Sequence, residues 1–365
     1  MKRCTRCVMP DTRPGLQFNE AGVCQACLRY EARKTIDWDA RWKELVELAE
    51  TLKKQDHPLG FHCLVAVSGG KDSHAQMALL KNQLGLNPLM VSVSNMPGDW
   101  TTEGEKNFRN IVTVFGSDCL SLQISPKTAR QWFRFCFETY GSPTWYWDRA
   151  VYTYPLWMAS ALGIKTVFYG ENISWEYGGP EAADTPCAAN QLDNGVAKDL
   201  LVPSDFPAHW IAPPEASTVQ PRYLSYYIPW SGTRNRSVAE AHGFTPARPG
   251  SRDGFLDNYD QIDAEAYLVH AWMKYPKYGH ARATDMASGW IREGLMTRAE
   301  ALTRVREEDG KLDGWIKTKF CEFCGYTPNE FDEIVSRFYN RDLFRYDEEK
   351  KQWILLESEE SEAAE

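Results

Sequence analysis

The residues with the clearest chemical meaning in this chain lie between positions 63 and 73. An apolar run, Cys63–Val67, leads directly into six small, polar and charged residues, which are Ser68, Gly69, Gly70, Lys71, Asp72 and Ser73. A helical pattern with Met77, Leu80 and Leu84 on one face follows. Adjacent glycines let the backbone fold closely around phosphate oxygens, and the first N–H groups of a helix point toward such an anion. The segment therefore predicts a strand, a phosphate-binding turn and a helix.

The six-residue turn allows two other interpretations besides a phosphate site. A Walker A loop is excluded, because four residues separate its two glycines whereas Gly69 and Gly70 are adjacent. The other interpretation is an ordinary strand, turn and helix, in which the serine and aspartate side chains only cap the helix. The complete six-residue pattern, placed between a strand and a helix, favours the phosphate site.

Four cysteines near the N-terminus form two Cys-x2-Cys pairs. The pairs are Cys4 with Cys7 and Cys24 with Cys27, and sixteen residues lie between them. This spacing is typical of a zinc ribbon, in which four thiolates surround one Zn²⁺. Because four cysteine ligands complete the tetrahedral shell, we expect a structural zinc rather than a catalytic one. Four unpaired cysteines, or a redox or iron–sulfur site, are the alternatives.

Further along the chain, short apolar runs alternate with helical patterns. The runs that we expect to form strands are Cys63–Val67, Leu89–Ser94, Cys119–Ile124 and Lys165–Gly170. Helices are expected between them, as at 103–115 and 152–162. This alternation predicts an α/β fold with a parallel sheet, which binds ligands beyond the carboxyl ends of its strands. Ser68, Asn95 and residues 170–172 fall at such ends, so we expect them to lie near one another.

The predicted organisation has four parts. Residues 1–58 form the zinc ribbon and a linker helix, residues 59–250 form the parallel-sheet domain, and residues 251–356 form a mostly helical substrate or partner region. The last part, residues 357–365, contains five glutamates and is expected to be a disordered acidic tail.

Three segments within these parts carry local predictions. The apolar spacing in residues 38–52 predicts the linker helix. Residues 200–230 are rich in proline and aromatic side chains without a clean period, and they predict a long loop or insertion that could act as a lid. Thr297 and Glu300 have the spacing of a capping box, which predicts the start of a helix.

The composition indicates a soluble cytoplasmic enzyme. We find no apolar run of bilayer length and no signal peptide, and the clustered cysteines favour a reducing compartment. The net charge of −9 argues against a large nucleic-acid surface, which normally needs a basic face. We therefore expect neither a membrane nor a nucleic acid as a partner.

The six-residue turn resembles the SGGxDS pyrophosphate-binding loop of the ATP pyrophosphatase (PP-loop) superfamily, whose members cleave ATP to AMP and pyrophosphate. Further segments of the chain resemble one family within that superfamily. They are residues 4–27 with both cysteine pairs, Tyr169–Asn172, Glu176–Gly179, Tyr227–Ser231, Tyr278–Thr284 and Ile291–Arg298. Together with the loop, they resemble the N-acetyl sugar amidotransferases of bacterial surface-glycan biosynthesis, which act on lipopolysaccharide precursor sugars or on pseudaminic or legionaminic acid. The resemblance covers roughly residues 3–300.

This resemblance implies an ATP-dependent, AMP-forming enzyme that converts an acetamido group of a nucleotide-linked or nonulosonic sugar into an acetamidino group. The amide oxygen would attack the α-phosphorus of ATP and release pyrophosphate, and ammonia would then displace AMP. The implied cofactors are ATP, Mg²⁺ and a structural Zn²⁺. Residues 68–73 would bind ATP, with Lys71 and Asp72 as catalytic groups and Asp72 as the magnesium ligand.

Five further residues are candidates for substrate contacts, namely Glu171, Asn172, His280, Arg282 and Arg292. Glu171 and Asn172 follow an expected strand within a family segment. They are candidates for contact with substrate or with a metal ion, and helix capping is the alternative role for both. The histidine and the two arginines suit an acidic sugar or a nucleotide diphosphate, because guanidinium groups match carboxylates and phosphates.

The source of ammonia is not evident in this sequence. None of its ten cysteines lies in the Gly-x-Cys-x-Gly elbow of a triad glutaminase, so we expect a separate glutaminase subunit. Cys321 and Cys324 have no place in the family pattern. They are either two ordinary small residues or a second metal or redox pair.

Two competing functions remain. A tRNA-thiolating enzyme also joins a zinc ribbon to this phosphate loop, and it would use Cys119, Cys136 or Cys321 to carry sulfur. The acidic charge and the sugar-family segments weigh against it. A non-catalytic scaffold is the second alternative, and the intact phosphate loop argues against it.

Overall fold

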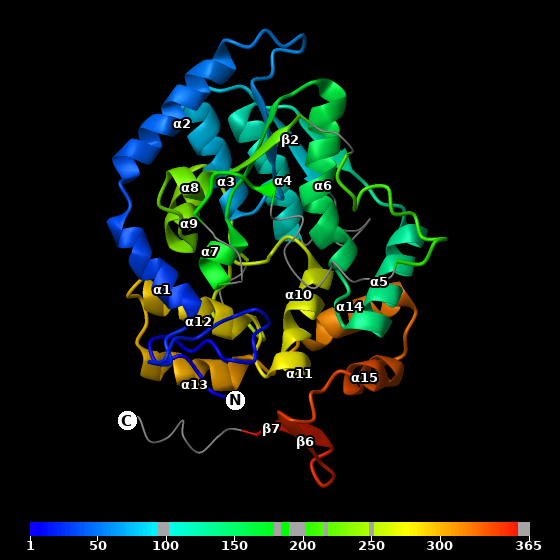
Figure 1. Ribbon diagram of the computed structural model, residues 1–365. Coiled ribbons are helices and arrows are strands. Elements are labelled where there is room, and N and C mark those ends of the chain that lie inside the picture. The colour runs from blue at the N-terminus through cyan, green and yellow to red at the C-terminus, as the bar shows by residue number, and fades with distance from the viewer. Residues whose placement is uncertain (94–101, 179–183, 190–201, 215–217, 248–251, 357–365) are drawn as a thin grey trace.

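A computed structural model describes residues 1–93, 102–178, 184–189, 202–214, 218–247 and 252–356 (Figure 1). Asn95, Gly179 and the predicted tail at 357–365 lie outside these residues. The described chain comprises a cysteine-rich N-terminal segment, an α/β part built on one sheet, and a mostly helical C-terminal part. In Figure 1 the N-terminal segment lies beside the C-terminal helices, below the sheet.

The central sheet has five strands, all parallel, in the order β3-β2-β1-β4-β5. The strands are β1 (Cys63–Ala66), β2 (Pro88–Val93), β3 (Cys119–Leu122), β4 (Thr166–Tyr169) and β5 (Gln220–Tyr223). The first four confirm the strands expected from the sequence. The strand order reverses between β1 and β4, and parallel sheets of this kind bind ligands at that point, beyond the strand ends. The phosphate turn follows β1 and Glu171 follows β4, so both lie there.

Helices precede, connect and follow the strands of this sheet. They are α1 (Gln25–Ala32) with a short 3₁₀ turn (Arg33–Thr35), α2 (Trp38–Lys53), α3 (Lys71–Met77) with a π-helical extension (Ala78–Gln83), α4 (Thr102–Phe115), α5 (Pro126–Tyr140), α6 (Trp145–Leu162), α7 (Ile173–Tyr177), α8 (Leu224–Tyr227) and α9 (Gly232–Ala241). α2, α4 and α6 confirm the helices predicted at 38–52, 103–115 and 152–162.

The C-terminal part contains six helices and a hairpin among the described residues. These elements are α10 (Glu265–Trp272), α11 (Lys274–Tyr278), α12 (Arg282–Arg292), α13 (Arg298–Glu308), α14 (Gly314–Cys324), α15 (Pro328–Ser336), β6 (Phe344–Asp347) and β7 (Gln352–Leu355). α13 begins with the predicted capping box, in which Thr297 and Glu300 each bond the backbone N–H of the other.

Each face of the sheet buries a separate apolar core, because successive strand residues point to opposite sides. Val65 and its neighbours on one face pack against α2, α3 and α4, for example against Leu45 and Ile111. Leu64 and Val167 on the other face pack against α5 and α6. Burial on both faces explains why these strands read as continuous apolar runs.

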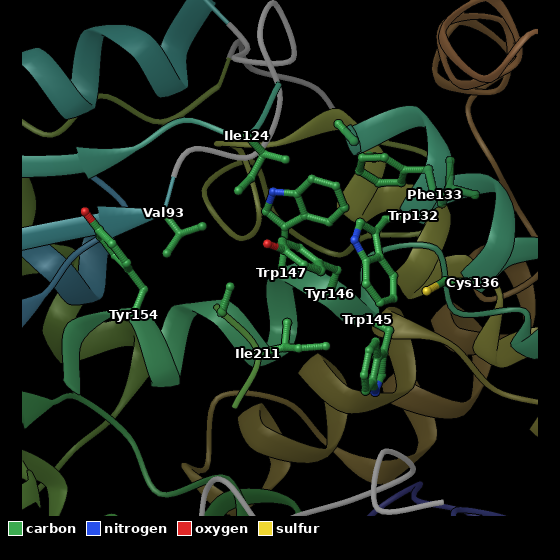
Figure 2. Close-up of a cluster of buried hydrophobic side chains, with 14 of the residues drawn as sticks. Val93, Ile124, Trp132, Phe133, Cys136, Trp145, Tyr146, Trp147, Tyr154 and Ile211 are labelled. Atoms are coloured by element: carbon green, nitrogen blue, oxygen red, sulfur yellow. The ribbon is translucent and has the colours of Figure 1, made fainter. Parts of the chain in front are cut away.

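Aromatic residues of α5 and α6 fill the second core (Figure 2). Trp132 and Tyr146 are almost completely buried, and the rings of Phe133 and Trp147 stack with 4.2 Å between centroids. α14 joins this cluster, since the ring of its Phe320 lies 5.2 Å from that of Phe137. These aromatic side chains therefore attach the C-terminal helices to the sheet.

The prediction of a loop throughout residues 200–230 was wrong for residues 220–227, which form β5 and α8. The strand escaped detection because Pro221 interrupts its pattern. Proline is tolerated there because β5 is an edge strand of the sheet. The outer side of β5 is covered by residues 186–188, where Ala188 N–H donates to the Pro221 carbonyl.

The cysteine-rich segment packs on the C-terminal helices rather than on the sheet. Val8 lies in a core with Ala283 of α12 and Ala301 of α13. The Arg298 guanidinium donates to the carbonyl oxygens of Cys4 and Cys7, at 3.2 and 3.1 Å. Among the described helices, none is both long enough and apolar enough to cross a membrane.

Candidate active site

The predicted phosphate turn is a compact loop at the end of β1. Gly69 has φ of +93°, and a Cβ atom there would lie 2.9 Å from the Phe108 Cα of α4. Ser73 on the first turn of α3 accepts a hydrogen bond from the Ser68 N–H at 2.9 Å. The Gly70 N–H points back to the Ser68 hydroxyl at 3.3 Å. The turn therefore requires glycine at position 69 and holds both serine hydroxyls at the start of the helix.

The two charged residues of the turn contact each other and two distant segments. Lys71 donates to Asp72 at 2.7 Å, and its Nζ lies 3.7 Å from Asp260. Asn235 of α9 donates to the other oxygen of Asp72 at 2.7 Å. Burial alone would lower the pKa of Lys71, but Asp72 and Asp260 raise it well above its usual value. The lysine is thus fully charged beside the phosphate turn.

Asp260 lies at the junction of the turn with α12. Its Oδ2 accepts from Arg282 at 2.6 Å, and Arg282 also donates to the Tyr177 hydroxyl at 3.0 Å. Burial would raise the pKa of Asp260, yet Arg282 and Lys71 outweigh burial and lower it to about 2. Arg282, a predicted substrate contact, therefore belongs to a buried ion network with Lys71.

Glu171 and Asn172 lie at the end of β4, as predicted. Burial raises the pKa of Glu171 well above its usual value, and the nearby carboxylates of Glu176 and Asp72 add to this shift. A hydrogen bond between the side chains of Glu171 and Glu176 raises this pKa further. Asn172 is 3 % exposed and accepts backbone N–H bonds from α7 through its carbonyl oxygen. The structure thus places Glu171 in the charge network of the turn and buries Asn172 just before α7.

His280 lies two residues before the start of α12 and is buried. It is 1 % exposed, and neither ring nitrogen has a hydrogen-bond partner within the described structure. Burial lowers its pKa to about 3, despite the opposing charge of Asp285. Asp285 itself binds Arg13 at 2.7 Å and Lys274 at 2.9 Å. His280 is therefore a neutral, interior side chain, and its predicted substrate contact is untested.

A pocket adjoins the phosphate turn and reaches the predicted residue Arg292. Its wall combines Lys71 with side chains of α1, α7, α9 and α12. Aromatic residues provide much of the surface, and they are Tyr30, Trp175, Tyr177, Trp230, Tyr259 and Trp290. Arg282 and Arg292 both line it, as do Asp260 and Glu293. Flat aromatic faces beside a few charged groups are typical of a site for a polar small molecule.

The four predicted zinc ligands converge on one point. One Sγ atom from each of Cys4, Cys7, Cys24 and Cys27 lies within 4.8 Å of all the others, and all four residues are buried. The Cys4 sulfur accepts backbone N–H bonds from Arg6, Cys7 and Cys24, which stabilise thiolate charge. This donor set fits a tetrahedral metal ion, and four thiolates also suit an iron–sulfur cluster.

Cys321 and Cys324 show no comparable arrangement. Both lie in the aromatic core on α14, and the grouping of metal-binding residues found in the described chain is the N-terminal one. Burial raises the pKa of each thiol. The observed role of this pair is packing.

Sequence reasoning missed Asn235 and Asp260, which both contact the charged residues of the turn. No motif marks either, because their roles arise from contacts across more than a hundred positions of the chain. A cluster of polar residues at 257–260 in an otherwise aromatic stretch was the available signal.

The fold and the turn define a class, namely a parallel α/β protein whose first strand leads through a glycine turn into a helix N-terminus, and this turn resembles the loop of the ATP pyrophosphatases. Residues 253–358 match the family model of the C-terminal domain of WbpG-like LPS biosynthesis proteins. The C-terminal helices are thus similar to those of lipopolysaccharide biosynthesis proteins, and Asp260, Arg282 and Arg292 lie within the matched segment.

Among curated proteins, the chain is similar to the uncharacterized protein MJ1599 of Methanocaldococcus jannaschii. The two are 27 % identical over 172 residues, which is 47 % of this chain and 59 % of that protein. The chain therefore spans about three fifths of the length of this relative.

Solved structures overlap with the chain only loosely. NMN synthetase from Francisella tularensis has a TM-score of 0.36 and 12 % identity, over 76 % of this chain and 98 % of that one. The U34-tRNA thiolase NcsA from Methanococcus maripaludis, solved with its [4Fe-4S] cluster, has a TM-score of 0.32 and 13 % identity, over 88 % and 95 %. Overlaps this low say nothing about the reaction.

Proposed function

We propose that the chain is an ATP-dependent, AMP-forming amidotransferase that converts an acetamido group of a bacterial surface-glycan sugar into an acetamidino group. The observation that carries the proposal is the ion pair between Lys71 and Asp260. It joins an ATP pyrophosphatase loop to the segment that matches an LPS biosynthesis family. An ATP-using, sugar-modifying enzyme is the coarser function that both similarities support.

The proposed reaction has two steps. The amide oxygen of the sugar attacks the α-phosphorus of ATP, the bond to the bridging oxygen breaks, and pyrophosphate leaves. Ammonia then adds to the imidate carbon, whose oxygen carries the adenylyl group, and loses its extra protons to solvent or a nearby base; the C–O bond breaks, and AMP leaves with the former amide oxygen. The protein's main task is to hold pyrophosphate and to neutralise its developing charge.

The phosphate turn suits the first step. Ser68 and Ser73 present hydroxyls at its rim, and Lys71 supplies a buried positive charge. In the structure this charge is balanced by Asp72 and Asp260. The phosphates of ATP would compete with these carboxylates for the lysine. Binding ATP would therefore exchange one set of anionic partners for another.

Asp72 and Glu171 are the residues that would hold Mg²⁺, which neutralises phosphate charge when bound. Glu171 lies near enough to Glu176 and Asp72 for both carboxylates to raise its pKa, and a cation bound between them would relieve this repulsion. Both oxygens of Asp72 already have partners in Lys71 and Asn235. A bound cation would therefore share or displace one of these contacts.

The domain limits, the glutaminase subunit and the remaining site assignments are part of the same proposal. Residues 1–58, 59–250 and 251–356 would act as ribbon, ATP domain and substrate region. Ammonia would reach the pocket from a separate glutaminase chain, since no glutaminase elbow exists in this sequence. Purified chain should use ammonium but should not hydrolyse glutamine at the synthetic rate.

The structure gives the tRNA-thiolation alternative little support. Cys136 and Cys321 are buried, and burial raises the pKa of both thiols. Burial also raises the pKa of Cys119 to about 12. A sulfur carrier works as an accessible thiolate, so these three residues are poorly placed for the task.

The test is mass spectrometry of acetamido sugars incubated with the chain, ATP, Mg²⁺ and ammonium. Exchange of oxygen for NH lowers the sugar mass by about one unit, with AMP and pyrophosphate released in equal amounts. Lys71→Met should reduce pyrophosphate release by roughly a hundredfold or more, whereas Lys43→Met, at an exposed position on α2, should not. Pyrophosphate release that depends on tRNA instead of sugar would reject the proposal.

A further inference from the structure

The pocket beside the phosphate turn receives side chains from the segment that follows the cysteine cluster. Tyr30 of α1 and Arg33 of the next 3₁₀ turn line it together with Trp175 and Arg292. The cysteine-rich region therefore does more than pack on the C-terminal helices. It contributes part of the pocket wall opposite α12.

Two guanidinium groups of this wall are incompletely bonded. Arg33 donates one long hydrogen bond, 3.5 Å, to the Trp230 carbonyl, and its buried Nε has no partner. Arg292 donates to the Glu176 carbonyl at 3.1 Å, and its buried Nη1 has no partner. Within the described residues, the bonds of both arginines go to backbone carbonyls, and neither forms an ion pair with a carboxylate.

Five carboxylates also line this pocket, and each has another hydrogen-bond or ion-pair partner; they are Glu176, Asp257, Asp260, Asp285 and Glu293. Glu293 accepts a hydrogen bond from Thr233 at 2.8 Å, and the Glu176 side chain is hydrogen-bonded to that of Glu171.

Burial lowers the pKa of Arg33 to about 10, and the like charge of Arg292 opposes the attraction of Glu176. Burial would lower the pKa of Arg292 as well, but Cys7, Cys27 and Cys24 of the cysteine cluster, and then Glu176, raise it. The buried N–H groups that lack a partner, one on each half-buried arginine, remain available to an anion in the pocket.

The surroundings of the two arginines suit a sugar. The Arg33 guanidinium lies over the ring of Trp175 at 5.2 Å and over that of Tyr30 at 6.0 Å. Stacking of this kind fixes the plane of the guanidinium and leaves its edge for hydrogen bonds. Aromatic faces would cover the apolar surface of a sugar ring, while the guanidinium edges would bind an anionic substituent.

We propose that Arg33 and Arg292 together bind an anionic group of the acetamido sugar, either a carboxylate on the ring or a phosphate of a linked nucleotide. The segment after the cysteine cluster is then part of the substrate site. This inference rests on the proposed function for the identity of the ligand. It assigns to Arg33, which no family segment includes, a direct role in substrate specificity.

The test measures binding by calorimetry with four probes, without ATP. The probes are N-acetylglucosamine, its uronic acid, and the UDP-linked form of each. Wild-type protein should bind at least one anionic probe ten- to a hundredfold more tightly than N-acetylglucosamine, as expected for charge-assisted hydrogen bonds. Tighter binding of the free uronic acid identifies a ring carboxylate as the bound group. Tighter binding of UDP-N-acetylglucosamine, whose sugar ring is uncharged, identifies a phosphate.

Arg33→Met and Arg292→Met keep the aliphatic stems and should each remove most of that preference. Lys34→Met is the matched control, because Lys34 is next in sequence but its side chain is 65 % exposed, paired with Glu31. Equal binding of all four probes by wild type, no binding of any, or an unchanged preference in both arginine variants would overturn the inference.

Pyrophosphate release distinguishes this inference from the proposed function. If the anion preference depends on Arg33 but no acetamido sugar supports pyrophosphate release, the subsite stands and the amidotransferase proposal fails. If sugars are amidinated but both arginine variants keep the wild-type preference, the amidotransferase proposal stands and the arginine subsite fails.

Discussion

Lys71 and Asp260 form an ion pair with 3.7 Å between Nζ and Oδ1. Lys71 belongs to the phosphate turn, and Asp260 belongs to the segment similar to LPS biosynthesis proteins. Asp260 also binds Arg282 on α12. One carboxylate therefore neutralises two buried cations, and it holds the C-terminal region against the turn where ATP is proposed to bind.

Replacing Asp260 with asparagine should destabilise the fold. The carboxylate is buried, and its removal leaves Lys71 and Arg282 with less compensation for their charge. Loss of one partner from a buried ion network typically costs about 3 kcal/mol. Urea unfolding of Asp260→Asn should show this decrease in the free energy of unfolding.

The control for Asp260 is a surface ion pair on α4. Glu105 and Arg109 lie 2.5 Å apart with mostly exposed side chains, so Glu105→Gln should leave stability nearly unchanged. Equal stability of the two variants would show that the Asp260 network contributes no more than a surface pair.

Alanine at position 69 should damage the phosphate turn more than alanine at another left-handed glycine. Gly69 has φ of +93° and its Cβ would meet the backbone of Phe108, whereas Gly60 has φ of +73° and open space around it. We expect Gly60→Ala to cost about 1 kcal/mol and Gly69→Ala about 3 kcal/mol. Denaturant unfolding checks the difference, and calorimetry should show that only Gly69→Ala weakens ATP binding. Similar losses of stability in both variants would mean that α4 does not lie this close to Gly69 in solution.

The parts of the fold that sequence could predict depend on local patterns. Cys63–Val67 reads as a buried strand because both of its faces are covered, and the two cysteine pairs are recognisable from spacing alone. β5 was missed because Pro221 and Arg222 break the apolar pattern of an edge strand.

The site was less predictable than the fold, because its contacts join distant parts of the chain. Asn235 reaches Asp72 across 163 positions, and nothing near it in sequence indicates this. His280 lies in a motif typical of the family, yet a motif cannot distinguish a pocket side chain from a buried one. Arg33 escaped notice because it lies in a short turn between two segments of interest.

Removing one cysteine of the cluster should abolish metal binding. Cys24→Ser breaks a four-thiolate site, so metal content should fall from about one ion per chain toward zero. Elemental analysis measures zinc and iron separately, and a broad absorbance near 400 nm would identify an iron–sulfur cluster instead. Cys324→Ser, at a buried cysteine outside the cluster, should keep the metal. Metal retained by Cys24→Ser, or absent from wild type, would contradict the predicted site.

Acid should destabilise the protein partly through His280. Burial lowers the pKa of this residue to about 3, whereas an unfolded histidine titrates near 6.5. Between these two pH values His280 is protonated in the unfolded chain but neutral in the folded chain. The stability contributed by neutral His280 is therefore complete above about pH 6.5 and is lost as the pH falls, by about 1.4 kcal/mol per unit.

Replacing His280 with leucine removes this titration, so the decrease in unfolding free energy between pH 7 and pH 5 should shrink by about 2 kcal/mol. His74, which burial holds at a pKa of about 4, continues to contribute acid sensitivity in the variant. His209→Leu, at an exposed position, should leave the pH profile unchanged. Urea unfolding at several pH values provides the comparison. A His280→Leu profile parallel to that of wild type would mean that His280 accepts a proton in the folded state, and that its ring nitrogens have partners in solution.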